Sequence, residues 1–149
     1  MKSARLVALA ALALSVAAGA AHALDFKSVG ANPAVLYDAP SAKGRKVFVA
    51  PRGMPVEVVL TYGDWTKVRD AAGDLSWVES KMLTAKRSLI VSANSAKVRA
   101  SAEDGAALAF TADKGVLLDR LDPAASGWVK VRHRDGQAGF VKASEVWGE

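Results

Sequence analysis

The chain has 149 residues, with 20 lysines and arginines, 15 aspartates and glutamates, two histidines and no cysteine, and a formal net charge of +5. A chain of this length forms one ordinary domain or two very small ones. The absence of cysteine excludes a disulfide framework, zinc held by thiolates, a thiolate nucleophile and a haem-attachment motif. Two histidines leave little room for an imidazole metal site, and no cofactor or metal is expected.

Residues 1–23 have the features of a secretory signal peptide. Lys2 and Arg5 provide the positive start, an apolar run follows, and the segment ends in Ala21-His22-Ala23, a small-residue cleavage site. The apolar run is about 13 residues, shorter than the roughly 20 that span a bilayer as a helix. The alternative is an uncleaved N-terminal anchor. We expect export, cleavage after Ala23 and a periplasmic protein with no membrane insertion afterwards.

Cleavage lowers the net charge. Without Lys2 and Arg5 the chain keeps 18 basic side chains against 15 acidic ones, a net charge of +3. This excess is too small to predict a nucleic-acid partner, because nucleic-acid-binding domains carry strongly basic patches. A small positive charge suits contact with an anionic polymer of the cell envelope. We expect the exported chain to be a monomer.

The remaining chain repeats one unit twice. Gly63–Leu83 aligns with Ser126–Val146 at an offset of 63 residues, and the one additional residue of the second copy falls in the Asp122–Gly127 loop. Identical residues mark the two copies at Trp65/Trp128, Lys67/Lys130, Val68/Val131, Arg69/Arg132, Gly73/Gly136 and Val78/Val141. The sequence therefore predicts two units, residues 24–84 and 86–147, which almost abut.

Each unit is predicted to consist of short strands joined by turns. Pro55–Tyr62 and Asp64–Arg69 are rich in β-branched and aromatic residues, and Gly63-Asp64 between them is a turn signal. Arg134–Gln137 contains Asp-Gly, a strong hairpin signal. No stretch after the leader shows a helical period beyond about two turns. The prediction is an all-β protein. Because units of about 60 residues bury little surface, we expect the two to pack against each other.

The repeated pattern Gly-Asp/Gly-Trp-x-Lys-Val-Arg, followed by a glycine, an aromatic residue and valine, resembles the bacterial SH3-like family. Behind a signal peptide, the duplicated unit resembles the exported tandem SH3-like proteins of proteobacteria. The resemblance covers residues 24–147 and implies two tandem five-stranded SH3-like barrels with a binding role in the cell envelope. It names no ligand and brings no catalytic residues.

Eukaryotic SH3 domains bind proline-rich peptides in a groove lined by aromatic side chains. The first unit keeps part of this groove, with Leu36-Tyr37-Asp38, Trp65 and Trp77 at matching positions. The positions that depart from the pattern are Ala39, Glu79 and Met82 in the first unit and Arg99, Lys142 and Glu145 in the second. Polyproline recognition needs the complete set of aromatic residues. It is therefore not expected of the second unit and has only partial support in the first.

Alternation along the repeated Trp strand places its residues on two faces. In the first unit Val68 and Thr66 face the core, and in the second Val129 and Val131 do. The opposite faces carry Trp65, Lys67 and Arg69 in the first unit and Trp128, Lys130 and Arg132 in the second. A sugar ring can stack on such an indole and a carboxylate can pair with the arginine, which suits peptidoglycan. The alternative is that each indole lies flat on its barrel under the stems of the lysine and arginine.

These patterns favour a non-enzymatic binding protein that recognises peptidoglycan or a periplasmic protein. The residues expected to bind are Tyr37, Trp65, Lys67, Arg69, Trp77, Trp128, Lys130 and Arg132. The second hypothesis is a periplasmic adaptor or inhibitor that binds a protein through a barrel edge or the cleft between the barrels. An enzyme is disfavoured, because no nucleophile elbow occurs and only His133 remains after cleavage.

Other polar groups suggest no site. His133 is expected to be a solvated loop residue. Asp70, Asp74 and Glu79 miss the spacing of a calcium-binding loop. The cations Lys43, Arg45, Lys46 and Arg52 are interpreted as solvated loop residues, with contact to a polyanion as the alternative.

Overall fold

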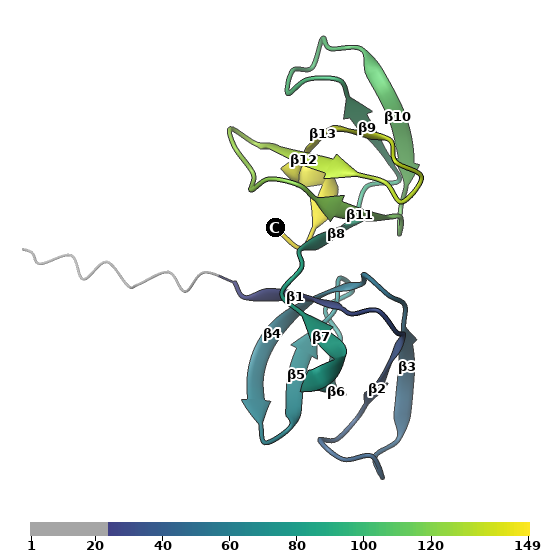
Figure 1. Ribbon diagram of the computed structural model, residues 1–149, viewed down its shortest axis with the longest axis vertical. Helices are drawn as coiled ribbons and strands as arrows, with labels where there is room; N and C mark the ends of the chain where they lie inside the picture. The colour runs from purple at the N-terminus through teal and green to yellow at the C-terminus, as the bar shows by residue number, and fades with distance from the viewer. Residues whose placement is uncertain (1–23) are drawn as a thin grey trace, which may run out of the picture.

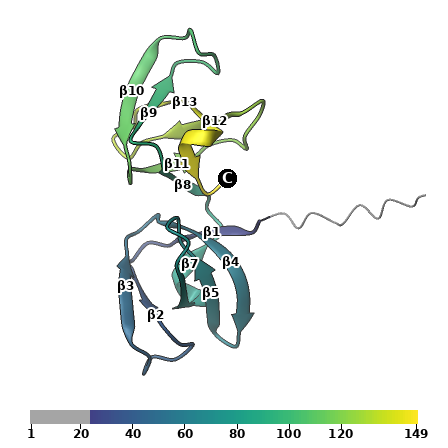
Figure 2. The same cartoon turned by 180° about the vertical axis from the view of Figure 1, so that it is seen from behind.

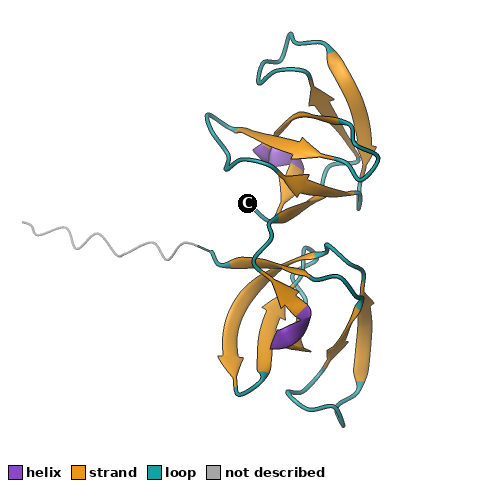
Figure 3. Ribbon diagram, in the orientation of Figure 1, coloured by secondary structure: helices purple, strands orange, loops and turns teal. Residues whose placement is uncertain are grey.

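The computed structural model describes residues 24–149, which form two lobes of β-structure (Figure 1). The expected leader and its cleavage site lie outside these residues. The only helical turns in the described part are two short 3-10 segments, Ser80–Met82 and Ala143–Glu145 (Figure 3). Within residues 24–149 no helix is long and apolar enough to cross a membrane. The all-β prediction is confirmed.

Each lobe is one antiparallel sheet of seven short strands. The first sheet contains β1 (Phe26–Val29), β2 (Ala34–Tyr37), β3 (Lys46–Ala50), β4 (Pro55–Tyr62), β5 (Trp65–Arg69), β6 (Leu75–Glu79) and β7 (Leu83–Thr84). The second contains β8 (Ser88–Val91), β9 (Ser95–Arg99), β10 (Leu108–Asp113), β11 (Leu117–Arg120), β12 (Trp128–Arg132), β13 (Ala138–Lys142) and β14 (Val146–Trp147). Their orders, β3-β2-β6-β5-β4-β1-β7 and β10-β9-β13-β12-β11-β8-β14, are equivalent strand by strand. The predicted duplication is therefore a duplication of the fold.

Five-stranded barrels were expected, whereas each unit has seven strands in one sheet that strand pairing does not close into a barrel. In the first sheet β3 and β7 are the two ends and do not pair with each other, and in the second β10 and β14 are the ends. The strand count rises because each unit has an additional hairpin, β2–β3 or β9–β10, and a two-residue strand, β7 or β14, after its 3-10 turn. A two-residue strand is too short to show alternation, so the sequence carries no signal for it.

Both lobes bury a small core of aliphatic side chains. Leu36, Val56 and Val68 are fully buried in the first lobe, and Leu89 and Leu118 in the second. The hairpin predicted at Arg134–Gln137 is confirmed. Gly136 in this turn and the aligned Gly73 in the first unit have φ of 95° and 91°, a backbone conformation that favours glycine.

The lobes touch through β1 of the first lobe and through β8 and β14, the first and last strands of the second. The rings of Phe26 and Trp147 meet edge to face at 5.1 Å, and the Arg87 guanidinium lies 5.4 Å from the Phe26 ring centre. The Ser88 hydroxyl donates to the Gly53 carbonyl at 2.5 Å and shares a hydrogen bond with the Ser28 hydroxyl. The expected contact between the units is present, although it is small and leaves two distinct lobes (Figure 2).

Candidate functional site

The predicted facing of the Trp strands is correct. In β5, Thr66 and Val68 are buried, whereas Trp65, Lys67 and Arg69 lie half-buried on the side away from the core. In β12, Val129 and Val131 are buried and the other three residues point outward. We call the side away from the core the outer face of each sheet.

Strand register brings the predicted residues of the first lobe together. Leu60, Lys67, Trp77 and Tyr37 are successive cross-strand partners on β4, β5, β6 and β2. Directly paired residues share a face, so these four side chains form one row on the outer face.

A second row lies beside the first and adds two aromatic rings. Tyr62 and Trp65 are partners at the β4–β5 turn. The Trp65 ring meets the Tyr37 ring edge to face at 5.4 Å, and the Lys67 ammonium lies 5.8 Å from the Trp77 ring centre. We define Tyr37, Leu60, Tyr62, Trp65, Lys67 and Trp77 as the aromatic face.

Sequence reasoning missed two members of this face. Tyr62 is 67% exposed and Leu60 is 46% exposed, the most open apolar side chains on it. The signal was present, since a tight turn at Gly63-Asp64 places Tyr62 opposite Trp65. Tyr37, in contrast, is buried, so its ring supports Trp65 from below.

The arginines of the two outer faces are already paired. Arg69 Nη1 donates to both carboxylate oxygens of Glu57 at 3.0 and 3.2 Å. Arg132 pairs with Asp119 at 3.4 Å from the equivalent position of the second lobe. Each of these salt bridges would have to open before its arginine could meet a ligand carboxylate.

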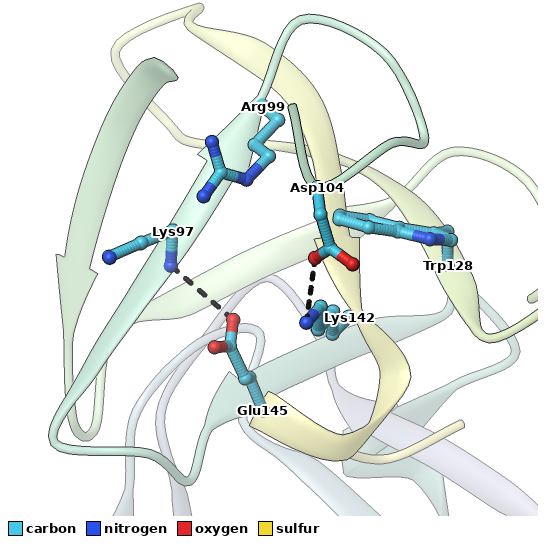
Figure 4. Close-up of a pocket in the computed structure, with 6 residues that line it drawn as sticks. All are labelled: Lys97, Arg99, Asp104, Trp128, Lys142 and Glu145. Carbon is cyan, nitrogen blue, oxygen red and sulfur yellow. Dashed lines mark hydrogen bonds and ion pairs between the residues drawn. The ribbon is translucent and has the colours of Figure 1, made fainter. Parts of the chain in front are cut away.

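The second lobe has a charged pocket in place of the aromatic face. A cavity of about 190 Å³ is lined by Lys97, Arg99, Asp104, Trp128, Lys142 and Glu145 (Figure 4). We call these six residues the charged pocket. Arg99, Lys142 and Glu145 are the residues that depart from the aromatic pattern of a polyproline groove, and the fold gathers them beside Trp128. Lys97 and Asp104 were not predicted.

Contacts hold the charges of this pocket in place. Lys142 Nζ lies 2.7 Å from Asp104 Oδ1 and 5.8 Å from the Trp128 ring centre. Arg99 Nη1 donates to the Ala106 carbonyl at 3.0 Å. The backbone N–H of Lys97 donates to Glu145 at 3.3 Å. Lys130 is exposed on β12 but does not line the cavity.

The ion pair between Lys142 and Asp104 should be detectable in the titration of the Asp104 carboxyl. The hydrogen bond from Lys142 and then its positive charge hold the pKa of the Asp104 carboxyl below its ordinary value. Burial opposes this shift in part, and the positive charge of Arg99 adds a smaller lowering. A carboxyl whose pKa is lowered by folding stabilises the fold above its unfolded pKa, and this contribution is lost as the pH falls through the folded pKa. We expect Lys142→Ala to raise the Asp104 pKa in an NMR titration of the side-chain carboxyl. Lys86→Ala, which removes one of the two ion-pair partners of Asp119 instead, should leave it unchanged; equal effects of both variants would contradict the assignment.

The remaining polar groups form no site of their own. His133 is less solvated than expected, since its Nδ1 lies 3.0 Å from Asp135 and its ring lies near Phe110. The backbone N–H of Gln137 is the main cause of the lowered pKa of the Asp135 carboxyl. Among residues 24–149 no three His, Asp or Glu side chains gather in a group that could hold a metal ion.

Comparison with known proteins identifies the family. The sequence profile of the bacterial SH3 domain matches residues 30–84 and again residues 92–148. The chain belongs to the bacterial SH3 domain family. Its two lobes are tandem bacterial SH3 domains, as the repeated Trp and Gly pattern predicted. No curated protein matches the chain.

Solved structures with a similar arrangement share little sequence with these SH3 domains. NlpC2 and NlpC1 from Trichomonas vaginalis are each 12% identical with a TM-score of 0.39, over 85% and 89% of this chain and 49% of theirs. A NlpC/P60 family protein from Bacillus cereus is 15% identical with a TM-score of 0.38, over 83% of this chain and 56% of its own. The chain spans about half the length of these structures. Similarity at this level carries no argument about function.

Proposed function

We propose that this protein is a non-enzymatic binding protein of the periplasm whose tandem SH3 domains recognise peptidoglycan or a protein partner in the cell envelope. The observation that carries the proposal is the pair of unlike outer faces on two copies of one fold. One copy presents aromatic rings and the other presents a pocket of paired charges beside an indole.

The aromatic face suits a sugar. The Trp65 and Trp77 rings are half-buried, and the largely exposed Tyr62 extends the apolar surface beside them. An aromatic ring presents a flat apolar surface with a polar edge, on which the apolar side of a pyranose can stack. Lys67 beside Trp77 supplies a donor for hydroxyl groups at the margin of the face.

The charged pocket suits a short peptide with charges of both signs. Lys97, Arg99 and Lys142 supply cationic donors for carboxylates, while Asp104 and Glu145 accept from an ammonium group. Peptidoglycan joins sugar rings to peptides that carry such groups. A strand of this polymer could therefore contact the aromatic face and the charged pocket at the same time. Two weak contacts on one strand bind more tightly together than either does alone.

A protein partner is the second candidate, and a specific feature favours it. An open cleft of about 1070 Å³ lies between the SH3 domains and is lined by residues of both. Arg52 from one domain and Arg134 from the other enter this cleft without an ion-pair partner among residues 24–149. An acidic segment of an envelope protein would match them.

Co-sedimentation with isolated peptidoglycan sacculi tests the proposal. We expect the purified protein to sediment with the sacculi, and Trp128→Ala and Trp65→Ala each to weaken binding by about tenfold, or about 1.4 kcal/mol. Leu108→Ala is the matched control, because Leu108 is 52% exposed but belongs to neither the aromatic face nor the charged pocket. Thermal unfolding of each variant confirms that the fold is retained.

The outcomes separate the two candidates. Binding that is lost in the tryptophan variants and kept in Leu108→Ala supports peptidoglycan recognition by the outer faces. If all protein stays in the supernatant at low salt, wall binding is wrong. Specific loss of a co-purifying envelope protein from Arg134→Glu would then support the second candidate.

A further inference from the structure

The strand β3 is the free end of the first sheet. It pairs only with β2, and no strand among residues 24–149 lies on its other side. Figures 1 and 2 show β3 at the outer margin of its domain from both sides. Alternate residues of an edge strand point their backbone N–H and C=O groups outward, where they can pair with another chain.

The side chains of this edge are apolar and open. Val47, Phe48 and Val49 are consecutive and 45%, 50% and 61% exposed. Phe48 lies opposite the buried Leu36 and so points to the core side, while Val49 lies opposite Val35 on the outer side. Both faces of the strand therefore expose apolar surface. Soluble proteins usually protect such an edge with charges, proline or a covering segment.

The second domain has a less apolar version of this edge. The equivalent residues on β10 are Ala109, Phe110 and Thr111. Phe110 packs against the core of its domain, whereas Phe48 is not part of the first domain's core. Both strands have a register shift near the same place, so the backbones match and the difference lies in the side chains.

Charges at the two ends of β3 indicate the kind of chain that would cover it. Lys43 and Lys46 precede the apolar residues and Arg52 follows them, and none of the three forms an ion pair within residues 24–149. Asp38, which follows the Lys46 partner Tyr37, already pairs with Arg45 at 3.4 Å. Both ends of the edge are thus cationic.

A second copy of this chain does not match these charges. Antiparallel pairing of two β3 strands about Phe48 places Arg52 of each beside the Lys43–Lys46 end of the other. Parallel pairing places Lys46 beside Lys46. Like charges in directly opposite positions destabilise a strand pair.

We propose that β3 binds, by strand addition, an extended apolar segment of a partner protein that carries acidic residues at both ends. The backbone groups of the segment continue the first sheet beyond β3, and its side chains cover Val49 on one face and Phe48 on the other. Its carboxylates pair with Lys43 or Lys46 at one end and Arg52 at the other. This surface shares no residue with the aromatic face or the charged pocket, so its use does not depend on peptidoglycan binding.

A designed peptide tests the proposal without knowledge of the partner. The probe is a fluorescein-labelled peptide, DEVTVVVTVDE, with KRVTVVVTVKR and DEVTVPVTVDE as matched peptides that reverse the charge or prevent strand pairing. Binding is measured by fluorescence anisotropy, and hydrogen exchange locates it. We expect the acidic peptide to bind, to slow exchange at β3 and not at β10, and to bind at least about tenfold more tightly than either matched peptide.

Two protein variants make the test specific. Val49→Lys places a charge on the exposed side of the edge and should weaken binding of the acidic peptide at least about tenfold. A contact that depended on charge alone would instead become stronger, because the new ammonium group attracts the acidic peptide. Thr111→Lys makes the equivalent change on β10 and should leave binding unchanged. Both positions are exposed, so neither variant should alter the unfolding temperature.

Several results would overturn strand addition at β3. They are an absence of binding up to about 1 mM peptide, equal binding of the proline peptide, and equal effects of Val49→Lys and Thr111→Lys. Dimerisation of the unliganded protein that Val49→Lys abolishes would show that a second copy occupies the edge. Sacculi binding by Val49→Lys is measured in parallel, and its retention separates this surface from the proposed function.

Discussion

Replacing Gly139 with alanine is expected to unfold the second SH3 domain or lower its unfolding temperature sharply. A Cβ at this buried glycine of β13 would lie 2.5 Å from the Arg99 carbonyl oxygen and 2.9 Å from Val98 Cγ1. Both atoms belong to β9, the strand beside β13. Because a backbone carbonyl cannot turn away as a flexible side chain can, the strands must separate. Overpacking of this kind costs about 1–3 kcal/mol or more.

Differential scanning calorimetry and urea unfolding measure this effect. Gly105→Ala is the matched control, since a Cβ at Gly105 meets nothing within 4 Å. The charged pocket should be lost together with the β9–β13 pairing, because Arg99 and Lys142 reach the pocket from these two strands. A Gly139→Ala protein as stable as Gly105→Ala would contradict the packing of β9 on β13.

The aligned residue in the first domain explains why the repeat alone does not reveal this constraint. At the offset of 63 residues Gly139 corresponds to Ser76, which is also buried. The first domain therefore accommodates a side chain where the second has none. A difference of this kind depends on how closely two strands approach, and strand separation leaves no pattern in the sequence.

The fold could be predicted from the sequence because its signals are local. The β5 alternation of Trp65 and Lys67 against Thr66 and Val68 determines which side faces the core. The Asp-Gly pair in Arg134–Gln137 predicts a hairpin turn, and Gly136 there has the positive φ that such turns need. The open sheet was not predicted, because closure of a barrel depends on whether β3 reaches a partner across the domain, a contact between segments that carry no pairing signal.

The candidate site was predicted only in part, because some of its contacts join segments that carry no pairing signal in the sequence. Tyr37, Trp65 and Trp77 were expected together, and register places them together. Asp104 comes from a loop, and its contact with Lys142 links residues 38 positions apart. The pairing of Arg69 with Glu57 follows from the β4–β5 register, including a bulge at Val59 that the sequence does not signal.

The duplicated domains have kept one backbone and diverged on two surfaces. The outer face is aromatic in the first domain and charged in the second, and the free edge is more apolar on β3 than on β10. The cores remain alike, with Val68 and Val131 fully buried at equivalent positions. The largest differences therefore lie on surfaces, as expected if the two domains bind different ligands as proposed.

Replacing Leu36 with alanine is expected to destabilise the first domain by about 3 kcal/mol. Leu36 is among the largest fully buried side chains of the described residues, with 1% of its surface exposed. Its removal costs the transfer free energy of the lost atoms and leaves a cavity that the small core fills only in part. A domain of about 60 residues is marginally stable, so a loss of this size removes a large part of its stability.

The consequence reaches both proposed activities of the first domain. Tyr37 follows Leu36 on β2 and Phe48 lies opposite it on β3, so the aromatic face and the β3 edge should both weaken, while the charged pocket of the second domain stays formed. Calorimetry should resolve a separate, earlier transition for the first domain. Val35→Ala is the control, because Val35 lies on the other side of the same strand and is only half-buried.

Since few contacts join the lobes, we expect the second domain to unfold close to its original temperature. A single transition that shifts as a whole would instead show that the Phe26–Trp147 and Ser28–Ser88 contacts make the two domains one cooperative unit.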